Sequence, residues 1–348
     1  MKFLYSVFIC CLLSLLPAGA QVIESRVKST ERFMREFEAA NIEHLKIANQ
    51  HGNIFISAWD EDLVEVETLI TLGTRNETAR EEILEMISIN QRNYSGILDY
   101  MTTFSEDFFS NYPFSIDYHV KMPARLNLII DNSMGDVSID SIMGVIKLTQ
   151  SYGKLQLQDI APNKKHHFDL TFVDGRMDNI GDGEFTFSNC NLQLTQGGSM
   201  KGQTQYGMLN FENFGALNIT SNTDRIAIAN IDSIQLSGNR CIAKLEQVST
   251  SLFCELIKGQ LNIDAAPSIK EITISNQAVN TTIKLPLGLA YIINGEVSNG
   301  RFTHPTPQHL QLFKENNRIS FSGNIGGEAS RPANVILFNK DAFITIKN

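Results

Sequence analysis

Between Arg125 and Asp264 the sequence consists of short phrases in which apolar and polar residues alternate, and each phrase closes with a turn containing Gly, Asn or Asp. Alternation of this kind predicts β-strands rather than helices. The apolar residues that close five phrases are separated by 18, 20, 34 and 17 positions, and 34 is two steps of 17: Ile142, Ile160, Ile180, Phe214 and Ile231. We therefore predict a repeat of about 18 to 20 residues.

Two all-β architectures could produce this spacing: antiparallel hairpins of a sandwich or barrel, or the stacked coils of a β-solenoid. A coil of about 20 residues loses roughly 30 kcal/mol of conformational freedom on folding, while four or five inward aliphatic side chains return roughly 6 to 15 kcal/mol. One coil is therefore unstable alone, and stacking on neighbours supplies the missing hydrogen bonds and burial. A sandwich has no reason to keep one period, so we predict a β-solenoid over residues 121–348.

Acidic and amide residues recur at one phase of the repeat. Asp140, Asp159 and Asp178 are 19 positions apart, and Asn213 and Asn230 hold the corresponding place in later phrases. Asn and Asp tolerate left-handed backbone angles and bond to nearby main chain, so we interpret them as corners of the coils. The alternative is a column of carboxylates that binds calcium or a sugar, but the calcium-binding nonapeptide with its paired glycines is missing.

The segment before the repeats has a different character, and we predict that residues 21–120 form strands and a helix that cap the solenoid. Residues 31–39 suit a helix or a strand, and residues 44–72 suit two or three strands with breaks at His51-Gly52 and at Asp60 to Asp62. Residues 77–87 carry the clearest helical pattern in the chain. Such a cap would cover the open edge of the first coil. The aromatic residues between Phe104 and Phe114 are expected to pack against it.

The first 20 residues have the pattern of a secretory signal peptide. Lys2 precedes an apolar run from Phe3 to Leu16, and small residues at Ala18 and Ala20 mark the cleavage site. The run of about 14 residues is shorter than the roughly 20 needed to span a bilayer. We therefore expect an exported protein with no integral membrane segment in the mature chain.

Composition excludes two broad classes of protein. The chain is 43% apolar, which excludes wholesale disorder, and its 29 basic residues are outnumbered by 38 acidic ones, which argues against nucleic acid as a partner. The mature chain keeps Cys190, Cys241 and Cys254. A disulfide between Cys241 and Cys254 is one interpretation, and we prefer the other, in which all three are small apolar core residues.

No catalytic, cofactor-binding or metal-binding residue is assigned from the sequence, because none of the seven histidines has a metal-site spacing and no nucleophile or phosphate-loop motif occurs. We expect His166 and His167 to lie in a solvated turn. Asp174, Arg176 and Asp178 are the only local candidates for a polysaccharide lyase site.

Two further features of the N-terminal segment were weighed as sites. Glu65 and Glu67, which follow the acidic run Asp60 to Asp62, alternate with valines and are interpreted as the solvated outer face of a strand. Trp59, the single tryptophan, is expected to pack against the cap rather than to serve as a ligand platform.

Three sequence motifs are informative when taken together: IANQHGNIFISAWDEDLVEVE (47–67), the YGKLQLQDI type of unit, and INGEVSNGRF followed later by SGNIGG. Together they resemble the putative adhesin family of bacterial domains of unknown function, which is similar to the head domain of putative autotransporter adhesins. The chain departs from that pattern in the aromatic stretch 104–114 and at residues 183–200, where the repeat is blurred.

The resemblance implies a single-stranded right-handed β-helix that a Gram-negative bacterium exports to its periplasm, its surface or the medium. It implies no catalytic residues and no cofactor. The function expected from it is a non-catalytic, adhesin-like interaction with an envelope protein or an extracellular glycan. The alternative is a β-helix hydrolase or lyase that acts on polysaccharide.

Overall fold

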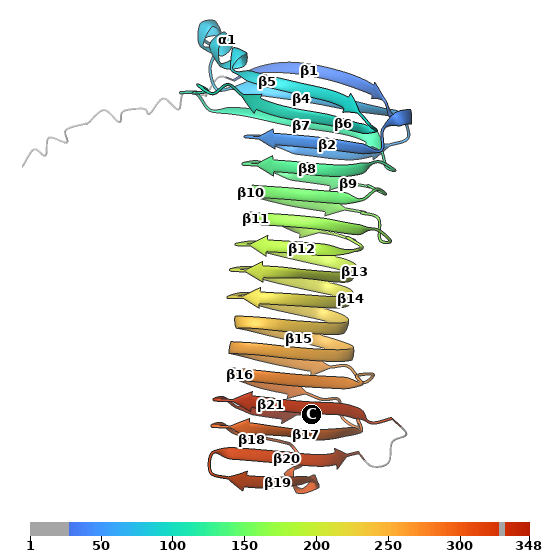
Figure 1. Ribbon diagram of the computed structural model, residues 1–348, viewed down its shortest axis with the longest axis vertical. Coiled ribbons are helices and arrows are strands. Elements are labelled where there is room, and N and C mark those ends of the chain that lie inside the picture. Colours follow the sequence, from blue (N-terminus) through green and yellow to red (C-terminus); the bar gives the residue numbers. More distant parts are fainter. Residues whose placement is uncertain (1–27, 327–330) are drawn as a thin grey trace, which may run out of the picture.

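The computed structural model describes residues 28–326 and 331–348, so the predicted signal peptide lies outside the described residues. In the described part of the chain, 22 strands join into one continuous open sheet, and the longest helix has nine residues. Figure 1 shows the strands stacked above one another in a long column, with the chain passing from the front of the column to the back and forward again. The protein is therefore almost entirely β-structure.

The middle of the column is built from coils, each with a strand on a first face, a corner, and a strand on a second face. The first face is the one turned to the viewer in Figure 1, where β12 is labelled. The strands of these coils are β8 (Asn127–Ser133), β9 (Val137–Asp140), β10 (Ile146–Gln158), β11 (Lys165–Met177), β12 (Asp182–Ser188), β13 (Asn191–Gln205), β14 (Met208–Asn222), β15 (Arg225–Ala265) and β16 (Glu271–Lys284). Long strands such as β10 and β15 pass around one or more corners.

Neighbouring coils run parallel, and paired residues on adjacent coils are 17 to 20 positions apart in the sequence. Paired positions are 18 residues apart between β8 and β10, 20 between β10 and β11, 17 from β11 through β14 to β15, and 20 between β15 and β16. The Ala161 N–H donates to the carbonyl of Ile142 at 2.9 Å, which places Ile142 and Ile160 in adjacent coils. This arrangement contradicts the alternative of antiparallel hairpins in this part of the chain.

The segment that looked blurred in the sequence, residues 183–200, contains a regular coil. It pairs at the same offset of 17 residues on both sides, but Gly197 stands where the neighbouring coil has Phe214. A Cβ on Gly197 would lie 2.2 Å from a ring carbon of Phe214, so the Phe214 ring fills the space of the missing side chain. Phe214 of the next coil therefore provides the apolar side chain that this coil lacks at Gly197. This is why the closing apolar residues Ile180 and Phe214 are 34 positions apart, twice the repeat of 17.

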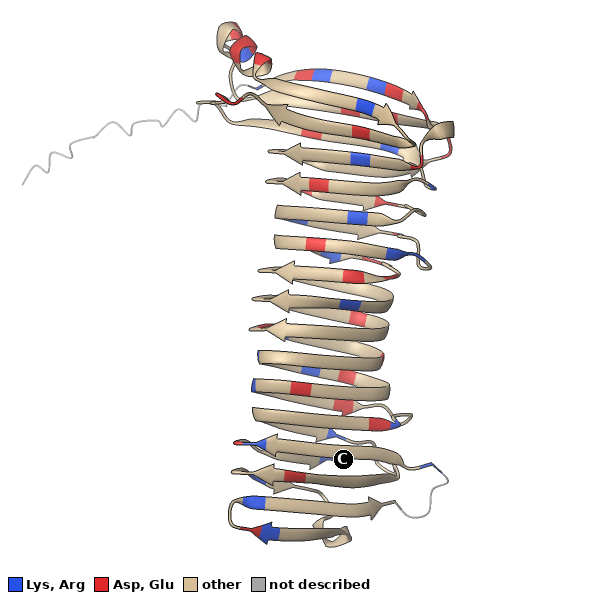
Figure 2. Cartoon of the chain, in the orientation of Figure 1, with Lys and Arg blue, Asp and Glu red and all other residues tan. Residues whose placement is uncertain are grey.

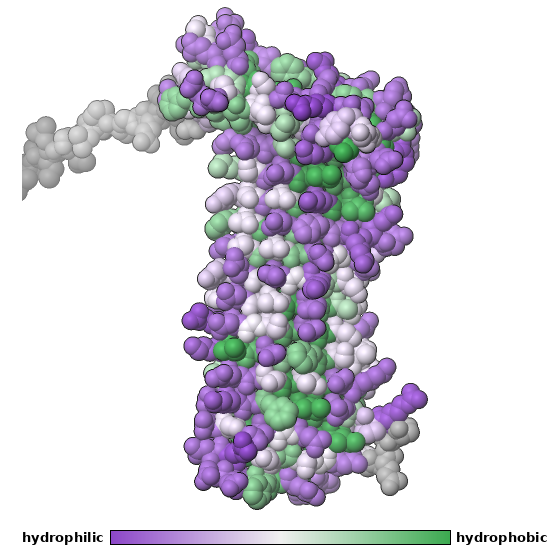
Figure 3. Space-filling view, viewed as in Figure 1, coloured by the Kyte–Doolittle hydropathy of each residue, from purple (hydrophilic) through white to green (hydrophobic). Residues whose placement is uncertain are grey.

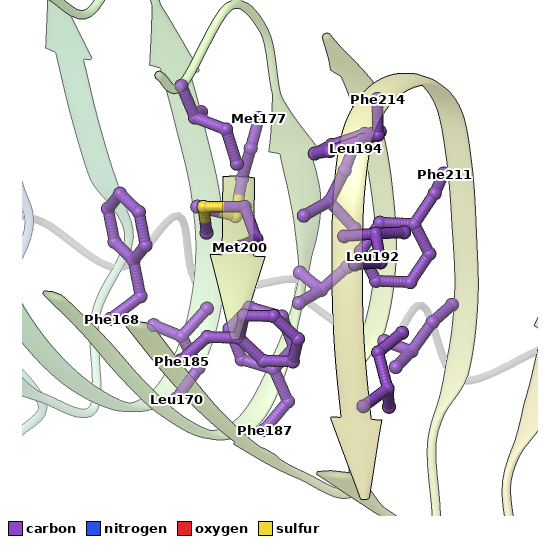
Figure 4. Packing of buried hydrophobic residues seen from close by; sticks show 14 of the residues in the cluster. Phe168, Leu170, Met177, Phe185, Phe187, Leu192, Leu194, Met200, Phe211 and Phe214 are labelled. Atoms are coloured by element: carbon purple, nitrogen blue, oxygen red, sulfur yellow. The ribbon is translucent and has the colours of Figure 1, made fainter. Parts of the chain in front are cut away.

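The core lies between the two faces. Along the strands of the middle coils, most inward side chains at every second position are buried, as the alternation predicts. The middle coils fill this space with aromatic rings: Phe185 and Phe187 have ring centroids 4.7 Å apart, and Phe211 lies 5.3 Å from Phe214. Figure 4 shows these rings meeting Leu192, Leu194 and Met200 from neighbouring coils. Burial of such layers supplies the stabilisation that one coil lacks.

The corner after each first-face strand is a left-handed residue. Ten residues in successive coils share a φ between 53° and 64°: His51, Met134, Tyr152, Phe172, Asn189, Tyr206, Thr223, Arg240, Lys258 and Ala278. We call this column the first corner. The opposite corner has positive φ at Ser141, Asp159 and Asn179, so the predicted left-handed corner is confirmed at Asp159, while Asp140 and Asp178 lie one residue before it. The prediction is wrong for Asn213 and Asn230, which lie within β14 and β15 and are joined by a side-chain hydrogen bond.

Buried amides hold the upper part of the first corner in place. Gln150 is fully buried, and its Nε2 donates to the carbonyls of Gly135 and Lys154, both at 3.0 Å. Asn132 donates to Gly135 in the same way at 3.1 Å. A Cβ on Gly135 would lie 1.9 Å from the carbonyl oxygen of Gly52 in the next coil, so only glycine fits there. These contacts explain the Asn-x-x-Gly turns in the sequence.

The N-terminal strands and the helix lie at the top of the column in Figure 1. Their bounds are β1 (Ser29–Glu38), the 3-10 helix η1 (Ala39–Asn41), β2 (His44–Gln50), β3 (Ile54–Trp59), β4 (Leu63–Leu72), α1 (Glu77–Glu85), β5 (Ile87–Tyr94), β6 (Ile97–Phe104) and β7 (Phe114–Pro123). Residues 31–39 are therefore mostly strand, and residues 44–72 form three strands with breaks at the predicted places. The predicted helix is confirmed and begins at the cap Asn76, whose side chain accepts from Ala79 N–H.

The aromatic stretch packs at this end of the molecule, as predicted, but only in part. Phe104, Phe108 and Phe114 have ring centroids 4.5 to 6.0 Å apart and cover His51 at the first corner. Phe109 is 68% exposed. Phe108 and Phe109 are neighbours in the loop between β6 and β7, and of the two only Phe108 is among these packed rings.

At both ends of the column a coil is inserted out of sequence order. The coil formed by β2 and β3 lies between β6–β7 on one side and β8–β9 on the other, with parallel pairing to both. The last strands of the chain lie between β16 and β17–β18. The C-terminal elements are β17 (Tyr291–Ser298), β18 (Phe302–Thr303), the 3-10 helix η2 (Pro307–His309), β19 (Leu310–Glu315), β20 (Arg318–Ile325), β21 (Ala333–Lys340) and β22 (Ile344–Lys347).

Candidate functional site

A groove of about 880 Å³ runs along the first face, across the coils from β11 to β16. Its floor is a column of small side chains that are paired from coil to coil: Ser199, Ala216, Ser233 and Ser251. Side chains two residues further along each strand are longer and form one wall: Lys201, Asn218, Gln235 and Phe253. We call this feature the axial groove, because it follows the long axis of the column.

The lining of the axial groove is mixed, with hydroxyl and amide groups set among apolar surface and charged side chains. Ser251 Oγ donates to Ser233 Oγ at 3.0 Å, and Asn218 Nδ2 donates to Gln235 Oε1 at 3.2 Å. Charged residues line both ends and the wall: Lys165 and Glu184 lie on β11 and β12, Lys201 on β13 and Glu271 on β16. Figure 3 shows this face, with hydrophobic positions between rows of hydrophilic side chains. The hydroxyl and amide groups can hydrogen-bond to a hydroxyl-rich chain, and the apolar surface between them can pack against it.

Charge is spread along the molecule rather than collected at the axial groove. In the view of Figure 2, basic and acidic positions alternate from the top of the column to the bottom. A field of one sign would steer a charged ligand toward a single face, and this face lacks such a field. Sequence reasoning missed the groove, although the recurrence of small outward residues at steps of 17 was a visible signal.

Asp174, Arg176 and Asp178, the sequence candidates for a lyase site, lie on the outer side of the second-face part of β11. Arg176 Nε is 2.8 Å from Asp178 Oδ1, and Thr195 Oγ1 also donates to Asp178. The Arg176 hydrogen bond, assisted by Thr195, holds the pKa of Asp178 below its usual range. A general acid for glycoside hydrolysis needs a raised pKa, so Asp178 suits pairing with Arg176 rather than that role.

The acidic residues near the N-terminal end are paired with cations. Glu65 Oε1 is 3.0 Å from Lys121 Nζ, and Glu67 pairs with Arg32 on the adjacent strand. Both point outward, opposite the buried valines of β4, as the alternation predicts. In the acidic run that precedes them, Asp62 accepts from Arg125 Nη2 at 2.6 Å. These contacts fasten strands to one another.

Trp59 lies at the end of β3 and is half-buried. Its indole N–H donates to the Leu63 carbonyl at 2.8 Å, and Lys121 Nζ lies 5.4 Å from its ring centroid. The indole therefore packs across the turn between β3 and β4, with a cation over one face of the ring. The indole thus has a packing role, as predicted.

The prediction that His166 and His167 lie in a solvated turn is wrong. Both belong to β11, and His166 is 2% exposed. The alternation that turns Phe168 and Leu170 inward turns His166 inward as well, because the loop ends before Lys165. His166 Nδ1 accepts from Ile146 N–H at 3.1 Å and Nε2 lies 2.9 Å from the Ala161 carbonyl, which selects the neutral ring with its proton on Nε2.

Acid is expected to weaken the fold through His166. Burial lowers the pKa of His166 from its usual 6.5, while the Ala161 hydrogen bond and Asp182 oppose this. Below about pH 6.5 the unfolded chain therefore takes up a proton that the folded chain excludes, so the contribution to stability is complete above that pH and falls as the pH drops. We expect the urea midpoint to fall less between about pH 7.5 and about pH 5.5 in His166→Asn than in the wild type.

His167→Asn is the matched control for this experiment. His167 is next in β11 but points outward and is half-buried. Its replacement should leave the pH dependence of the wild type in place. Equal slopes for His166→Asn and the wild type would contradict the role of the buried imidazole.

The three described cysteines are free, buried thiols, so the core interpretation is confirmed. Burial raises the pKa of Cys241 to about 11 and also raises the pKa of Cys190 and Cys254. A protonated thiol is a poor nucleophile and a poor metal ligand. We therefore assign these residues a packing role.

Over residues 28–326 and 331–348, no cluster of three or more His, Cys, Asp or Glu side chains is arranged to hold a metal ion. Within the same ranges, no helix combines the length and apolar character needed to cross a membrane.

No family model and no curated protein sequence matches the chain. Among solved structures, a putative adhesin from Parabacteroides distasonis is 11% identical, with 72% of this chain and 96% of that chain covered and a TM-score of 0.37. A putative adhesin from Parabacteroides merdae is 9% identical, with 91% and 97% covered and a TM-score of 0.32. A putative cell adhesion protein from Clostridium sporogenes is 10% identical, with 92% and 99% covered and a TM-score of 0.22. The chain is thus similar to solved proteins described as putative adhesins, the same description as the family that its sequence motifs resemble.

Proposed function

We propose that this protein is an exported, non-catalytic, adhesin-like binding protein whose axial groove holds a linear extracellular glycan. In this proposal the column is a single-stranded right-handed β-helix, closed at its N-terminal end by the strands and helix of residues 28–123. Its place is the envelope or surface of the bacterium. The observation that carries the proposal is the groove itself, which crosses successive coils and presents hydroxyl and amide groups beside apolar surface.

The direction of the groove supports an elongated ligand. Coils are stacked about 4.8 Å apart, so a linear chain that lies along the axis meets a similar set of polar groups at each step. Hydroxyl and amide side chains both donate and accept hydrogen bonds, as recognition of sugar hydroxyls requires. A polysaccharide hydrolase or lyase is the less favoured alternative, because Arg176 and Thr195 already engage the Asp178 carboxylate.

Filling the axial groove is expected to abolish glycan binding without unfolding the protein. Ala216 lies on the floor of the groove and points away from the core, so Ala216→Trp places a large ring in the groove. We expect an affinity loss of at least about tenfold for a glycan first identified on an array of bacterial and host polysaccharides, measured by titration calorimetry.

Thr220→Trp is the control, since Thr220 is exposed on the same strand but lies outside the groove. It should bind as the wild type does. Equal binding by both variants would show that the ligand lies elsewhere, and cleavage of the bound glycan over time would overturn the non-catalytic assignment.

A further inference from the structure

The first corner exposes large side chains at backbone positions that such residues rarely adopt. Met134, Tyr152, Phe172 and Tyr206 all have φ between 55° and 59°, and their exposed fractions are 56%, 52%, 47% and 58%. A left-handed conformation costs roughly 1 to 2 kcal/mol for a residue that is not Gly, Asn or Asp. The equivalent Ala278 shows that the corner needs no aromatic ring in order to form.

One pair of these rings offsets part of that cost. Tyr152 and Phe172 stack with centroids 5.0 Å apart and planes inclined by only 5°. Such a pair contributes about 0.5 to 1.5 kcal/mol beyond its burial. Tyr206 has no stacked aromatic partner of this kind within the described residues, so no contact of its ring offsets the cost of its left-handed backbone. Backbone strain that no contact within the fold offsets is often found at functional sites.

Between Phe172 and Tyr206 the column is interrupted by a small residue. Phe172, Asn189 and Tyr206 follow paired positions of three successive coils, and all three have a φ of 55°, so their side chains leave the backbone in the same direction. The Tyr152–Phe172 stack sets one step of the column at 5.0 Å, and two steps, 2 × 5.0 Å, separate Phe172 from Tyr206 by about 10 Å. A six-membered ring inserted above Asn189 would lie about 5 Å from each aromatic ring, a normal stacking distance.

The space above Asn189, between the rings of Phe172 and Tyr206, is called the gap. Its floor is polar, and the amide groups there are held by hydrogen bonds. Asn189 Nδ2 and Gln205 Nε2 both donate to Ser188 Oγ at 3.0 Å, which fixes the two amides. Their oxygen atoms remain as acceptors at the protein surface, and the carboxylate of Asp174 is exposed just beyond the corner on β11. Acceptors beside apolar ring faces match a saturated ring that carries hydroxyl groups.

We propose that Phe172 and Tyr206 clamp one pyranose ring of a neutral glycan above Asn189. This clamp lies at the first corner, away from the axial groove, and extends the proposed glycan-binding function to a second, independent site. A pyranose is favoured over an aromatic side chain of a protein partner because the floor presents fixed acceptors for hydroxyl groups. The ring faces contribute the stacking contacts, and Asn189, Gln205 and Asp174 orient the sugar.

The test is saturation-transfer NMR with the full mature chain and a set of methyl pyranosides (glucose, galactose, mannose and N-acetylglucosamine). The wild type should transfer saturation to the ring protons of at least one pyranoside. Asn189→Phe should abolish the transfer, because a third ring fills the gap. Thr223→Phe places the same ring at the equivalent corner beyond Tyr206, leaves the gap open, and should bind like the wild type.

Tyr206→Ala and Phe172→Ala should each reduce the transfer at least about fivefold, and both should fold, since Ala278 occupies the same corner position. Ala216→Trp fills only the axial groove and should leave the transfer unchanged, which separates failure of the clamp from failure of the groove. Transfer to none of the pyranosides, or transfer that Asn189→Phe leaves intact, would overturn the clamp. Binding of N-acetyltyrosine amide in place of every pyranoside would assign the gap to a protein partner instead.

Discussion

Replacing Leu337 by aspartate is expected to detach the C-terminal end of the column. Leu337 is fully buried in β21, which lies between β16 and β17 with parallel pairing to both. An unpaired carboxylate in this position loses the burial of the leucine and adds the cost of a buried charge, together about 5 kcal/mol. Because β17 has β21 as its link to the rest of the stack, β17 and β20 should separate with it. Limited proteolysis should then remove residues after β16 rapidly.

Ile336→Asp is the matched control. Ile336 is the preceding residue of the same strand, points to the opposite side, and is half-buried. Its replacement should leave the protease pattern of the wild type. If the two variants are cut at the same rate, the inserted position of β21 is wrong.

A second large effect is expected at Asp224, a carboxylate that is 2% exposed inside the first corner. Its Oδ2 accepts from Thr204 Oγ1 at 2.6 Å, from Ser221 Oγ at 2.7 Å and from Asn222 N–H at 3.1 Å. Its Oδ1 accepts from Gly207 N–H at 2.6 Å. Asp224→Ala leaves all four donors buried without their acceptor, and we expect a loss of about 4 kcal/mol in the free energy of unfolding.

Urea denaturation measures this loss, with Asp232→Ala as the control. Asp232 is exposed and accepts one hydrogen bond, from Ser249 Oγ, so its removal should cost about 0.5 kcal/mol or less. Asp224→Asn keeps the shape and one acceptor oxygen and should fall between the two. A loss at Asp224→Ala no larger than that at Asp232→Ala would show that the four donors find water or other partners.

Local patterns in the sequence predicted the strands and the corners well. Alternation located β2, β3 and β4 with their breaks, because inward and outward side chains differ in polarity wherever one side faces the core. Asp159 was correctly placed at a corner, because its type suits a left-handed backbone. The same argument could not find Tyr152 or Phe172, since aromatic residues are unfavourable at such angles and only the stacked coils impose them.

Other features depend on contacts between coils and are invisible in one phrase. Gly197 interrupts the pattern because its space belongs to Phe214 of the next coil. His166 was misplaced because two basic residues before it suggested a loop, although the alternation already marked it as inward. The insertion of β21 pairs it with β16 about 60 residues earlier, which no periodicity encodes. The axial groove likewise exists only where outward residues of several coils lie side by side.

The out-of-order coils at the two ends have a consequence for biogenesis. A chain that emerges from a translocon or ribosome amino end first could complete an ordinary solenoid one layer at a time. Here β2 and β3 gain their second neighbour only after residues up to Asp140 have emerged, and β16 gains its second neighbour only when Ala333–Lys340 arrives. The N-terminal layers are completed once Asp140 has emerged, and the central layers can then assemble in order, but the C-terminal end is sealed only after Ala333–Lys340 has emerged.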